Sequence, residues 1–195
     1  KACGEGLMPG GLAALRALGV ALEPQRGLPF RGIRYVNVED SPERVAEAPF
    51  LEGPGLGVRR TSLHAALVER AAEVGAELRW ATRALGLNDR GVITAAGPVE
   101  ARWVAGADGL HSRVRASRPG RSRLARTPPR PRFGVRRHYA TAPWSDWVEG
   151  YWAPGCEAYV TPVGPREVDL AFLTAKGDAR FDALLQRFPA LAHRL

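Results

Sequence analysis

The sequence predicts a mixed α/β fold in which two helices and several short strands precede a larger, mostly antiparallel sheet. Two apolar patterns with helical spacing indicate the first part, one over 7–19 that ends at Gly19 and one over 61–74 that ends at Gly75. Alternating segments rich in β-branched and aromatic residues, separated by Pro–Gly turns, indicate the larger sheet. The strands predicted for that sheet are 133–140, 148–152, 156–162 and 166–173.

The connecting segments are assigned by the same patterns. Residues 30–38 alternate and predict a strand, whereas 39–57 are rich in Pro, Glu and Gly and predict a loop. Glu77–Trp80 predicts the start of another strand, and residues 181–195 predict a helix that is interrupted at Pro189. Three short antiparallel strands are expected between these parts, at 82–87, 91–95 and 98–105, and the last should run directly into Asp108.

The composition is that of a globular protein, with 195 residues, of which 45% are hydrophobic and 25% charged. No run of 18 apolar residues occurs, so we expect no membrane-spanning helix. The two cysteines, Cys3 and Cys156, and the four histidines are scattered, so their spacing predicts neither a metal site nor a disulfide framework. We expect free thiols in a cytoplasmic protein.

The net charge of +8 is concentrated between Arg113 and Arg137, where ten arginines occur without an acidic residue. Such a run can form a patch that binds nucleic acid or another polyanion, and this stays the alternative function. The other interpretation is a solvated loop in a protein that uses arginine in place of lysine, since the chain has only two lysines. Aromatic residues that could stack on bases stand only at the end of the run, so we do not expect nucleic acid as a partner.

The most informative motif is Gly106-Ala107-Asp108-Gly109, followed by Leu110-His111-Ser112-Arg113. Small residues at the end of a strand allow a ligand to approach the backbone closely. An acid at that position can accept hydrogen bonds from ribose or ribityl hydroxyls, and Gly109 permits the chain to turn away. Alone, the motif also fits a common Asp–Gly turn.

The order of the elements around this motif gives it more weight. A helix preceded by Cys3-Gly4-Glu5-Gly6-Leu7, a helix that begins at Arg60, a small meander, the Asp108–Gly109 motif and a large sheet follow one another. This order, over most of residues 1–175, resembles the FAD-dependent monooxygenases of the para-hydroxybenzoate hydroxylase fold and their geranylgeranyl-reductase-like bacterial relatives. The resemblance implies a partial, three-layer Rossmann-like FAD-binding domain (1–29 and 58–120) and a substrate domain with a C-terminal helix (30–57 and 121–195).

The resemblance also implies roles for particular residues. Asp108 and Gly109 match the family's motif for FAD and NAD(P)H, Arg60 stands where the family contacts the FAD phosphates, and Cys3, Gly4 and Glu5 follow the FAD ribose-binding strand. Glu5 could instead stabilise a helix N-terminus, and Arg60 could be a surface residue at a helix start. The side chains expected to line a substrate pocket are Trp152, Tyr159 and Pro162, although sheet packing explains aromatic residues at this spacing equally well.

Two FAD-contacting segments of the family are absent from the sequence. It contains no glycine-rich GxGxxG turn after a strand, and Lys176-Gly177-Asp178 comes too early to be the family's later Gly-Asp segment. We therefore expect an internal fragment that binds FAD weakly or not at all and is inactive alone. Its parent would use FAD and NAD(P)H to hydroxylate or reduce a small apolar or aromatic substrate, with no catalytic side chain identified. Exposed sheet edges would favour self-association.

Overall fold

The structure is a computed structural model that describes residues 3–22, 26–39, 44–109, 111–117 and 131–195. The chain forms two compact units, which are Lys1–Gly75 with Arg130–Leu195, and Ala76–Pro129. Each unit is described by itself. The domain division expected from the sequence, 1–29 with 58–120 and 30–57 with 121–195, stays a prediction.

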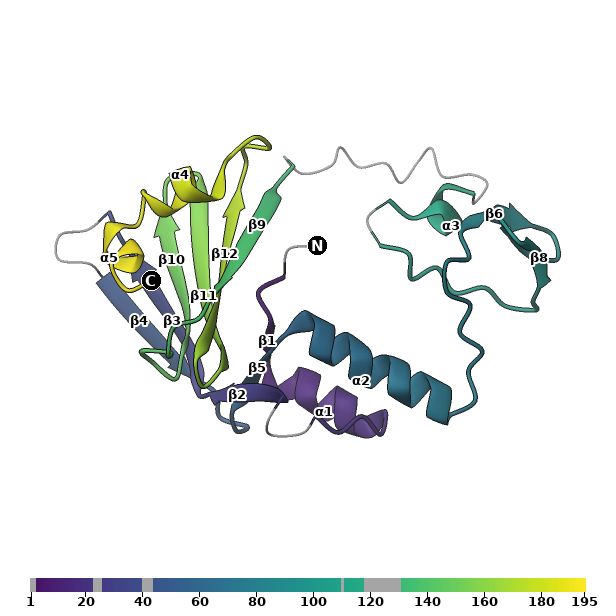
Figure 1. Ribbon diagram of the computed structural model, residues 1–195, viewed down its shortest axis with the longest axis horizontal. Coiled ribbons are helices and arrows are strands. Elements are labelled where there is room, and N and C mark those ends of the chain that lie inside the picture. The colour runs from purple at the N-terminus through teal and green to yellow at the C-terminus, as the bar shows by residue number, and fades with distance from the viewer. Residues whose placement is uncertain (1–2, 23–25, 40–43, 110, 118–130) are drawn as a thin grey trace. The chain divides into compact units, whose positions relative to one another are not determined.

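A six-stranded sheet dominates the first unit (Figure 1). Its strands, in spatial order, are β4 (Arg44–Pro49), β3 (Gly32–Asn37), β10 (Val148–Ala153), β11 (Cys156–Gly164), β12 (Glu167–Thr174) and β9 (Phe133–Tyr139). Only β3 and β10 pair in parallel, so the prediction of a mostly antiparallel sheet is confirmed. The four strands predicted for this sheet form within two residues of their expected limits.

The segment 39–57, expected to be a loop, contains two strands, so that prediction is wrong. Strand β4 is exposed along its whole length, because it is an edge strand held by backbone hydrogen bonds to β3 rather than by an apolar face. Half of the residues in strand β5 (Gly55–Val58) are glycine, which is disfavoured in strands, so the sequence pattern does not indicate a strand there. The predicted strand 30–38 also divides at Arg31, into β2 (Gly27–Phe30) and β3.

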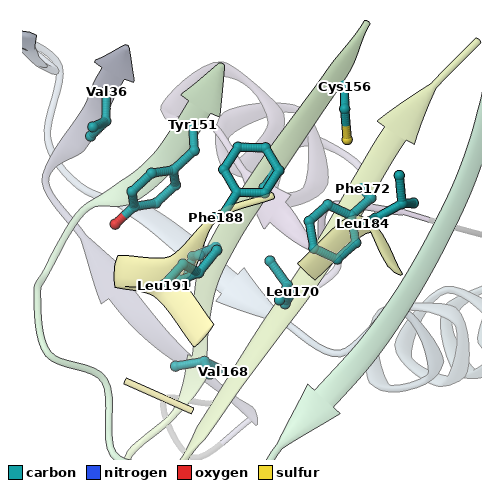
Figure 2. Packing of buried hydrophobic residues seen from close by; sticks show 11 residues of the cluster. Val36, Tyr151, Cys156, Val168, Leu170, Phe172, Leu184, Phe188 and Leu191 are labelled. Carbon is teal, nitrogen blue, oxygen red and sulfur yellow. The ribbon is translucent and has the colours of Figure 1, made fainter. Parts of the chain in front are cut away.

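One face of the large sheet carries the hydrophobic core (Figure 2). Two short helices, α4 (Phe181–Leu185) and α5 (Pro189–Ala192), cover it, and Pro189 separates them as predicted. Phe188, which is 1% exposed, lies between the helices and stacks on Phe172 with a ring separation of 5.8 Å. The strands contribute the other side of this core, with the residues Val36, Tyr151, Cys156, Ala158, Val160, Val168, Leu170 and Phe172.

A small antiparallel sheet, β1 (Gly6–Leu7), β5 and β2, adjoins the two longer helices α1 (Pro9–Ala17) and α2 (Arg60–Glu73) (Figure 1). Both helices form where the apolar spacing predicts them, and Gly19 and Gly75 end them with positive φ angles. The small sheet packs on β11 so closely that a side chain at Gly57 would overlap the Pro162 carbonyl. Thr161 Oγ1 also donates a hydrogen bond to the Gly4 carbonyl at 2.6 Å.

The second unit contains the meander β6 (Ala84–Asn88), β7 (Gly91–Thr94) and β8 (Gly97–Glu100), followed by α3 (Arg113–Ala116). The three short strands confirm the predicted meander, but β8 ends at Glu100 and Glu77–Trp80 forms no strand. Residues 101–105 and Glu77–Trp80 were predicted as strand from their apolar residues. They form none, because a strand also requires a neighbouring strand to pair with. Trp80 and Trp103 are 64% and 85% exposed. None of the helices in the described ranges combines the length and apolar character needed to cross a membrane.

A buried carboxylate fixes the middle of the large sheet. Glu149 on β10 is 1% exposed, and its oxygens accept four hydrogen bonds. The donors are Arg34 Nη1 (2.8 Å), Trp144 Nε1 (2.8 Å), Ser145 Oγ (2.9 Å) and the Tyr151 hydroxyl (2.8 Å). Because a buried polar group is tolerated only when it is hydrogen-bonded, these four donors satisfy the carboxylate oxygens of Glu149 inside the sheet.

Replacing Glu149 by alanine should therefore destabilise the first unit by about 3 kcal/mol, because one buried and three half-buried donors lose their acceptor. Glu47→Ala is the matched control: Glu47 also pairs with Arg34, at 2.8 Å, but its side chain is 43% exposed. Glu47→Ala should lower the free energy of unfolding by less than about 1 kcal/mol. Urea unfolding followed by tryptophan fluorescence measures both variants. Equal losses in the two variants would contradict this account of Glu149.

Candidate functional site

The face of the large sheet opposite the α4–α5 core is called here the second face. Strand register places two adjacent rows of side chains on it. The first row joins Tyr35, Gly150, Tyr159, Ala171 and Arg136 through successive strand pairs. The second row joins Thr161, Asp169 and His138. Aromatic and ionisable side chains therefore share one face of one sheet.

The aromatic part of the second face consists of Tyr35, Trp152 and Tyr159. The rings of Tyr35 and Trp152 meet edge to face at 5.8 Å, and Trp152 is 53% exposed. Gly150 lies between the two tyrosines, which would contact a side chain there at 3.5 and 3.8 Å. Tyr35 and Trp152 also line a surface cavity of ≈ 660 Å³ with Asn37, Ala46 and others. This arrangement can hold a flat apolar molecule.

Tyr159 is positioned by a polar partner. Its hydroxyl donates a hydrogen bond to Glu157, and Arg132 pairs with the same carboxylate at 2.5 Å. Burial and this hydrogen bond raise the pKa of Tyr159 to about 12. The phenol therefore keeps its proton at neutral pH and acts as a fixed hydrogen-bonding group rather than as a base.

The charged part of the second face surrounds Glu5, which lies just before β1 and has a φ of 52°. Its Oε1 accepts a hydrogen bond from the Arg60 backbone N–H at 2.7 Å and lies 2.5 Å from Arg136 Nη1. Its Oε2 lies 2.7 Å from His138 Nε2. Burial alone raises the pKa of Glu5, but the hydrogen bonds from His138, Arg60 and Arg136 outweigh it and lower the pKa below its usual 4.5. Glu5 is therefore ionised at neutral pH.

Asp169 completes this charged cluster from β12. Its side chain is 0% exposed, and neither carboxylate oxygen has a hydrogen-bond partner among the described residues. Arg136 Nη1 and His138 Nε2 both lie 3.5 Å from its Oδ1. Burial and the nearby negative charge of Glu5 raise the pKa of Asp169 from 3.8 to about 7. Glu5 and Asp169 thus differ in protonation within one cluster.

Arg60 lies at the first position of α2, where the sequence predicts a phosphate contact. Its backbone N–H is used by Glu5, while its side-chain Nε is buried without a hydrogen-bond partner among the described residues. Cys3 and Gly4 are both exposed, and the Gly4 carbonyl is bound by Thr161. The structure therefore brings Glu5 and Arg60 together. It assigns the Glu5 carboxylate to the helix N-terminus, which was the alternative interpretation of that residue.

Asp108 and Gly109 belong to the second unit, where Asp108 caps α3. Its Oδ2 accepts hydrogen bonds from the backbone N–H groups of Arg113 (2.6 Å) and Val114 (3.2 Å). A hydrogen bond from Ser112, together with these two, lowers the pKa of Asp108. Gly109 has a φ of 79°, as expected for the turn. The motif thus has a structural role in its own unit, and its contact with a cofactor stays a prediction.

The three predicted substrate residues do not share one location. Trp152 and Tyr159 both lie on the second face, in register with neighbouring positions of β10 and β11. Pro162 is almost completely buried and pairs with Val168, whose side chain is part of the core beneath α4 and α5. Its carbonyl is the group that packs against Gly57. Pro162 therefore holds the small sheet against the large one, apart from Trp152 and Tyr159.

The arginine run is partly engaged inside the protein. Arg132 pairs with Glu157, Arg136 with Glu5, and Arg137 with Asp182 at 2.9 Å. These ion pairs reduce the positive charge available to a polyanion. The middle of the run, 118–130, lies outside the described residues.

Sequence patterns did not identify Arg136, His138 and Asp169. These residues come together only through the pairing of β9 with β12, which a linear pattern does not specify. One signal was present, because Asp169 interrupts the otherwise apolar segment Val168–Leu173, and an isolated acid in a buried strand indicates a special environment.

Comparison with known proteins identifies the fold. No family model and no curated protein matches the sequence. Among solved structures, the chain is similar to a geranylgeranyl bacteriochlorophyll reductase-like protein from Thermoplasma acidophilum, with a TM-score of 0.72 and 19% identity over 97% of this chain and 53% of that one. It is similar to 2-methyl-3-hydroxypyridine-5-carboxylic acid oxygenase, with a TM-score of 0.71 and 19% identity over 97% and 54%.

A third similar structure is PqsL of Pseudomonas aeruginosa, described as a probable FAD-dependent monooxygenase. Its TM-score is 0.65, with 22% identity over 89% of this chain and 51% of that one. This chain has the fold of these proteins. It spans about half of their length, and the mixed α/β fold class that the sequence predicts is confirmed.

The raised pKa of Asp169 predicts an unusual pH dependence of stability. An acid whose pKa is higher in the folded than in the unfolded chain binds more protons when folded, so stability falls as the pH rises from about 4 to about 7. The fall amounts to roughly 2–4 kcal/mol. Asp169→Asn should lack it, whereas Asp146→Asn, at an exposed ion pair, should retain it. Urea unfolding at several pH values measures the slope, and equal slopes in all three proteins would refute the assignment.

The role of Asp108 as a helix cap predicts a local effect of its removal. In Asp108→Ala, the backbone amides of Arg113 and Val114 should exchange with solvent about fivefold faster, because their acceptor is lost. Asp89→Ala removes an exposed acid from a turn of the same unit and should leave both rates unchanged. Hydrogen-exchange NMR measures the rates, and unaltered exchange in Asp108→Ala would show that the cap contributes nothing.

Proposed function

We propose that this chain is part of an FAD-dependent oxidoreductase that takes electrons from NAD(P)H and hydroxylates or reduces a small apolar or aromatic molecule. The observation that carries the proposal is the fold, which matches an oxygenase, a probable FAD-dependent monooxygenase and a reductase-like protein over nearly the whole chain. In such enzymes FAD supplies the redox chemistry, and the protein supplies binding, orientation and electrostatics.

The residues present fit one portion of the cofactor. A buried arginine Nε without a partner is a ready donor for a phosphate oxygen, and Arg60 offers it at the N-terminus of α2, where the helix dipole also favours an anion. The exposed backbone of Cys3 and Gly4 allows a ligand to approach the same helix end. Asp108, which is exposed, would contribute a carboxylate oxygen to a ribityl or ribose hydroxyl in addition to capping α3.

The substrate would lie on the second face of the large sheet. Trp152 and Tyr35 offer apolar ring surface beside the cavity, and Tyr159 offers a phenolic oxygen held in place by Glu157. Pro162 would act indirectly, by fixing the small sheet that carries Glu5. Aromatic walls with one oriented polar group favour a flat, weakly polar substrate.

The remaining features of the proposal concern the isolated chain. Without a glycine-rich pyrophosphate-binding turn, the 195 residues should bind FAD weakly and have no activity alone. We also propose that the parent acts in the cytoplasm, and that the chain alone self-associates through exposed strand edges such as β4. Flavin titration separates this function from polyanion binding by the Arg113–Arg137 run, which would instead show steep salt dependence.

The test compares the complete protein that contains this chain with the chain alone. The complete protein should elute from gel filtration with stoichiometric flavin and oxidise NAD(P)H, whereas the chain should retain little FAD. Arg60→Ala in the complete protein should raise the Kd for FAD about tenfold or more, because a charged donor to phosphate is lost. Arg16→Ala removes an exposed arginine from α1 and should leave the Kd unchanged. A complete protein that neither contains nor binds flavin would exclude the proposed function.

A further inference from the structure

His138 is placed so that its Nε2 can be held either with or without a proton. Glu5 Oε2, an acceptor, lies 2.7 Å away and binds the protonated nitrogen. Arg136 Nη1, a donor, lies 3.3 Å away and can bind the nitrogen after its proton has left. The imidazole is 18% exposed, so the ring can also exchange protons with water. A donor and an acceptor are thus both directed at the same ring nitrogen.

Asp169 offers a second position for the same proton. Its Oδ1 lies 3.5 Å from His138 Nε2, and it has no hydrogen-bond donor among the described residues that would stabilise the negative charge. A side-chain shift of roughly 0.5 Å brings the two atoms within hydrogen-bonding distance. Because the carboxyl group is completely buried, holding a proton removes the large desolvation cost of its charge.

We propose that Glu5, His138 and Asp169 form a proton-sharing triad in which one proton moves between His138 Nε2 and Asp169 Oδ1. In the transfer, the Nε2–H bond of an imidazolium breaks and the Oδ1–H bond of a neutral carboxylic acid forms. The imidazole keeps its proton on Nδ1, and Nε2 then accepts the hydrogen bond from Arg136. Proton number and total charge are the same on both sides of this step, so the triad stores a proton and returns it through the exposed ring to water.

The surrounding charges are arranged so that the transfer does not change the net charge of the cluster. Glu5 precedes β1, Arg136 and His138 lie on β9, and Arg59, just before α2, pairs with Glu167 of β12. With Asp169 neutral and His138 neutral, the charges of Glu5 and Arg136 cancel. With Asp169 ionised and His138 charged, the four groups again sum to zero. Transfer within the triad therefore leaves no net charge buried in either state.

A metal ion is the other occupant that these three side chains suggest, since their ligand atoms all lie within 4.8 Å of one another. Arg136 Nη1 already lies among them, 2.5 Å from Glu5 Oε1, 3.3 Å from His138 Nε2 and 3.5 Å from Asp169 Oδ1. A guanidinium stays charged at every accessible pH and repels a divalent cation at that distance. The arginine thus takes the position of the cation, and a proton is the species left to exchange.

The triad lies where it can supply protons to the proposed reaction, and this part of the inference rests on the proposed function. Arg136 stands in the same row of the second face as Tyr159, and His138 and Asp169 stand in the next row. Hydroxylation and reduction of a carbon skeleton both require protons to be delivered or removed. The triad is therefore a proton reservoir on the face that carries the aromatic residues, and it acts through neighbouring groups rather than by touching the substrate.

The experiment uses the 195-residue chain without flavin, so that its outcome is independent of FAD binding. Aspartate labelled with ¹³C at the carboxyl carbon and histidine labelled with ¹⁵N are followed by NMR across the neutral pH range. We expect the Asp169 carboxyl to be protonated just below neutral pH, and the ¹⁵N signal of His138 Nε2 to change together with the Asp169 carboxyl signal. Asp169→Asn should remove that coupled change at Nε2, because the partner that exchanges its proton is gone.

Asp182→Asn is the matched control, since it removes an exposed aspartate paired with Arg137 of the same strand β9. It should leave the Asp169 titration and the coupled change at His138 Nε2 in place. The unmodified chain is informative by itself, so a variant that fails to fold does not remove the test. An Asp169 signal that titrates as an ordinary carboxylate, a His138 Nε2 signal that behaves alike in the unmodified chain and in Asp169→Asn, or stoichiometric Mn²⁺ or Zn²⁺ binding abolished by Asp169→Asn would each overturn the proposal.

Discussion

The first unit depends on the Glu5 carboxylate, because this one group ties the N-terminal segment, the start of α2 and strand β9 together. It holds the backbone of Arg60, the guanidinium of Arg136 and the ring of His138, while its own carbonyl accepts a hydrogen bond from Val58 on β5. To reach all of them, Glu5 adopts a φ of 52°, a conformation that costs about 1 kcal/mol for a residue with a side chain. The charge-assisted hydrogen bonds offset that cost.

These contacts of Glu5 also explain why the pKa of Asp169 is raised while that of Glu5 is lowered. Glu5 receives the hydrogen bonds that would otherwise stabilise a second carboxylate, and its negative charge opposes ionisation of its neighbour. Glu149, elsewhere in the sheet, is equally buried but accepts hydrogen bonds from four donors. Two buried carboxylates in one sheet therefore differ in the number of hydrogen-bond donors that each receives.

Local patterns in the sequence sufficed for the elements that are defined by their own residues. The apolar spacing of α1 and α2, the glycines that end them, the four later strands and the break at Pro189 are all local properties. The patterns failed for segments whose conformation depends on whether a neighbouring strand pairs with them. Strand β4 exists because β3 offers it hydrogen bonds, and Glu77–Trp80 stays irregular although its residues favour a strand. The site follows the same rule: Arg60 and Glu5 adjoin recognisable helix starts, whereas His138 meets Asp169 through the register of distant strands.

The structural roles of Glu5 and Asp108 also bear on what the proposed cofactor site can be. Each of the two acids supports the N-terminus of a helix, with Glu5 at Arg60 and Asp108 at Arg113 and Val114. A carboxylate that already accepts backbone N–H groups is fixed in orientation, and fixed groups lose little entropy when a ligand binds. Each acid therefore fixes one helix end within its own unit, Glu5 at the start of α2 and Asp108 at the start of α3, and neither is a free binding group. In the first unit the buried Arg60 Nε, beside Glu5, is a donor without a hydrogen-bond partner among the described residues.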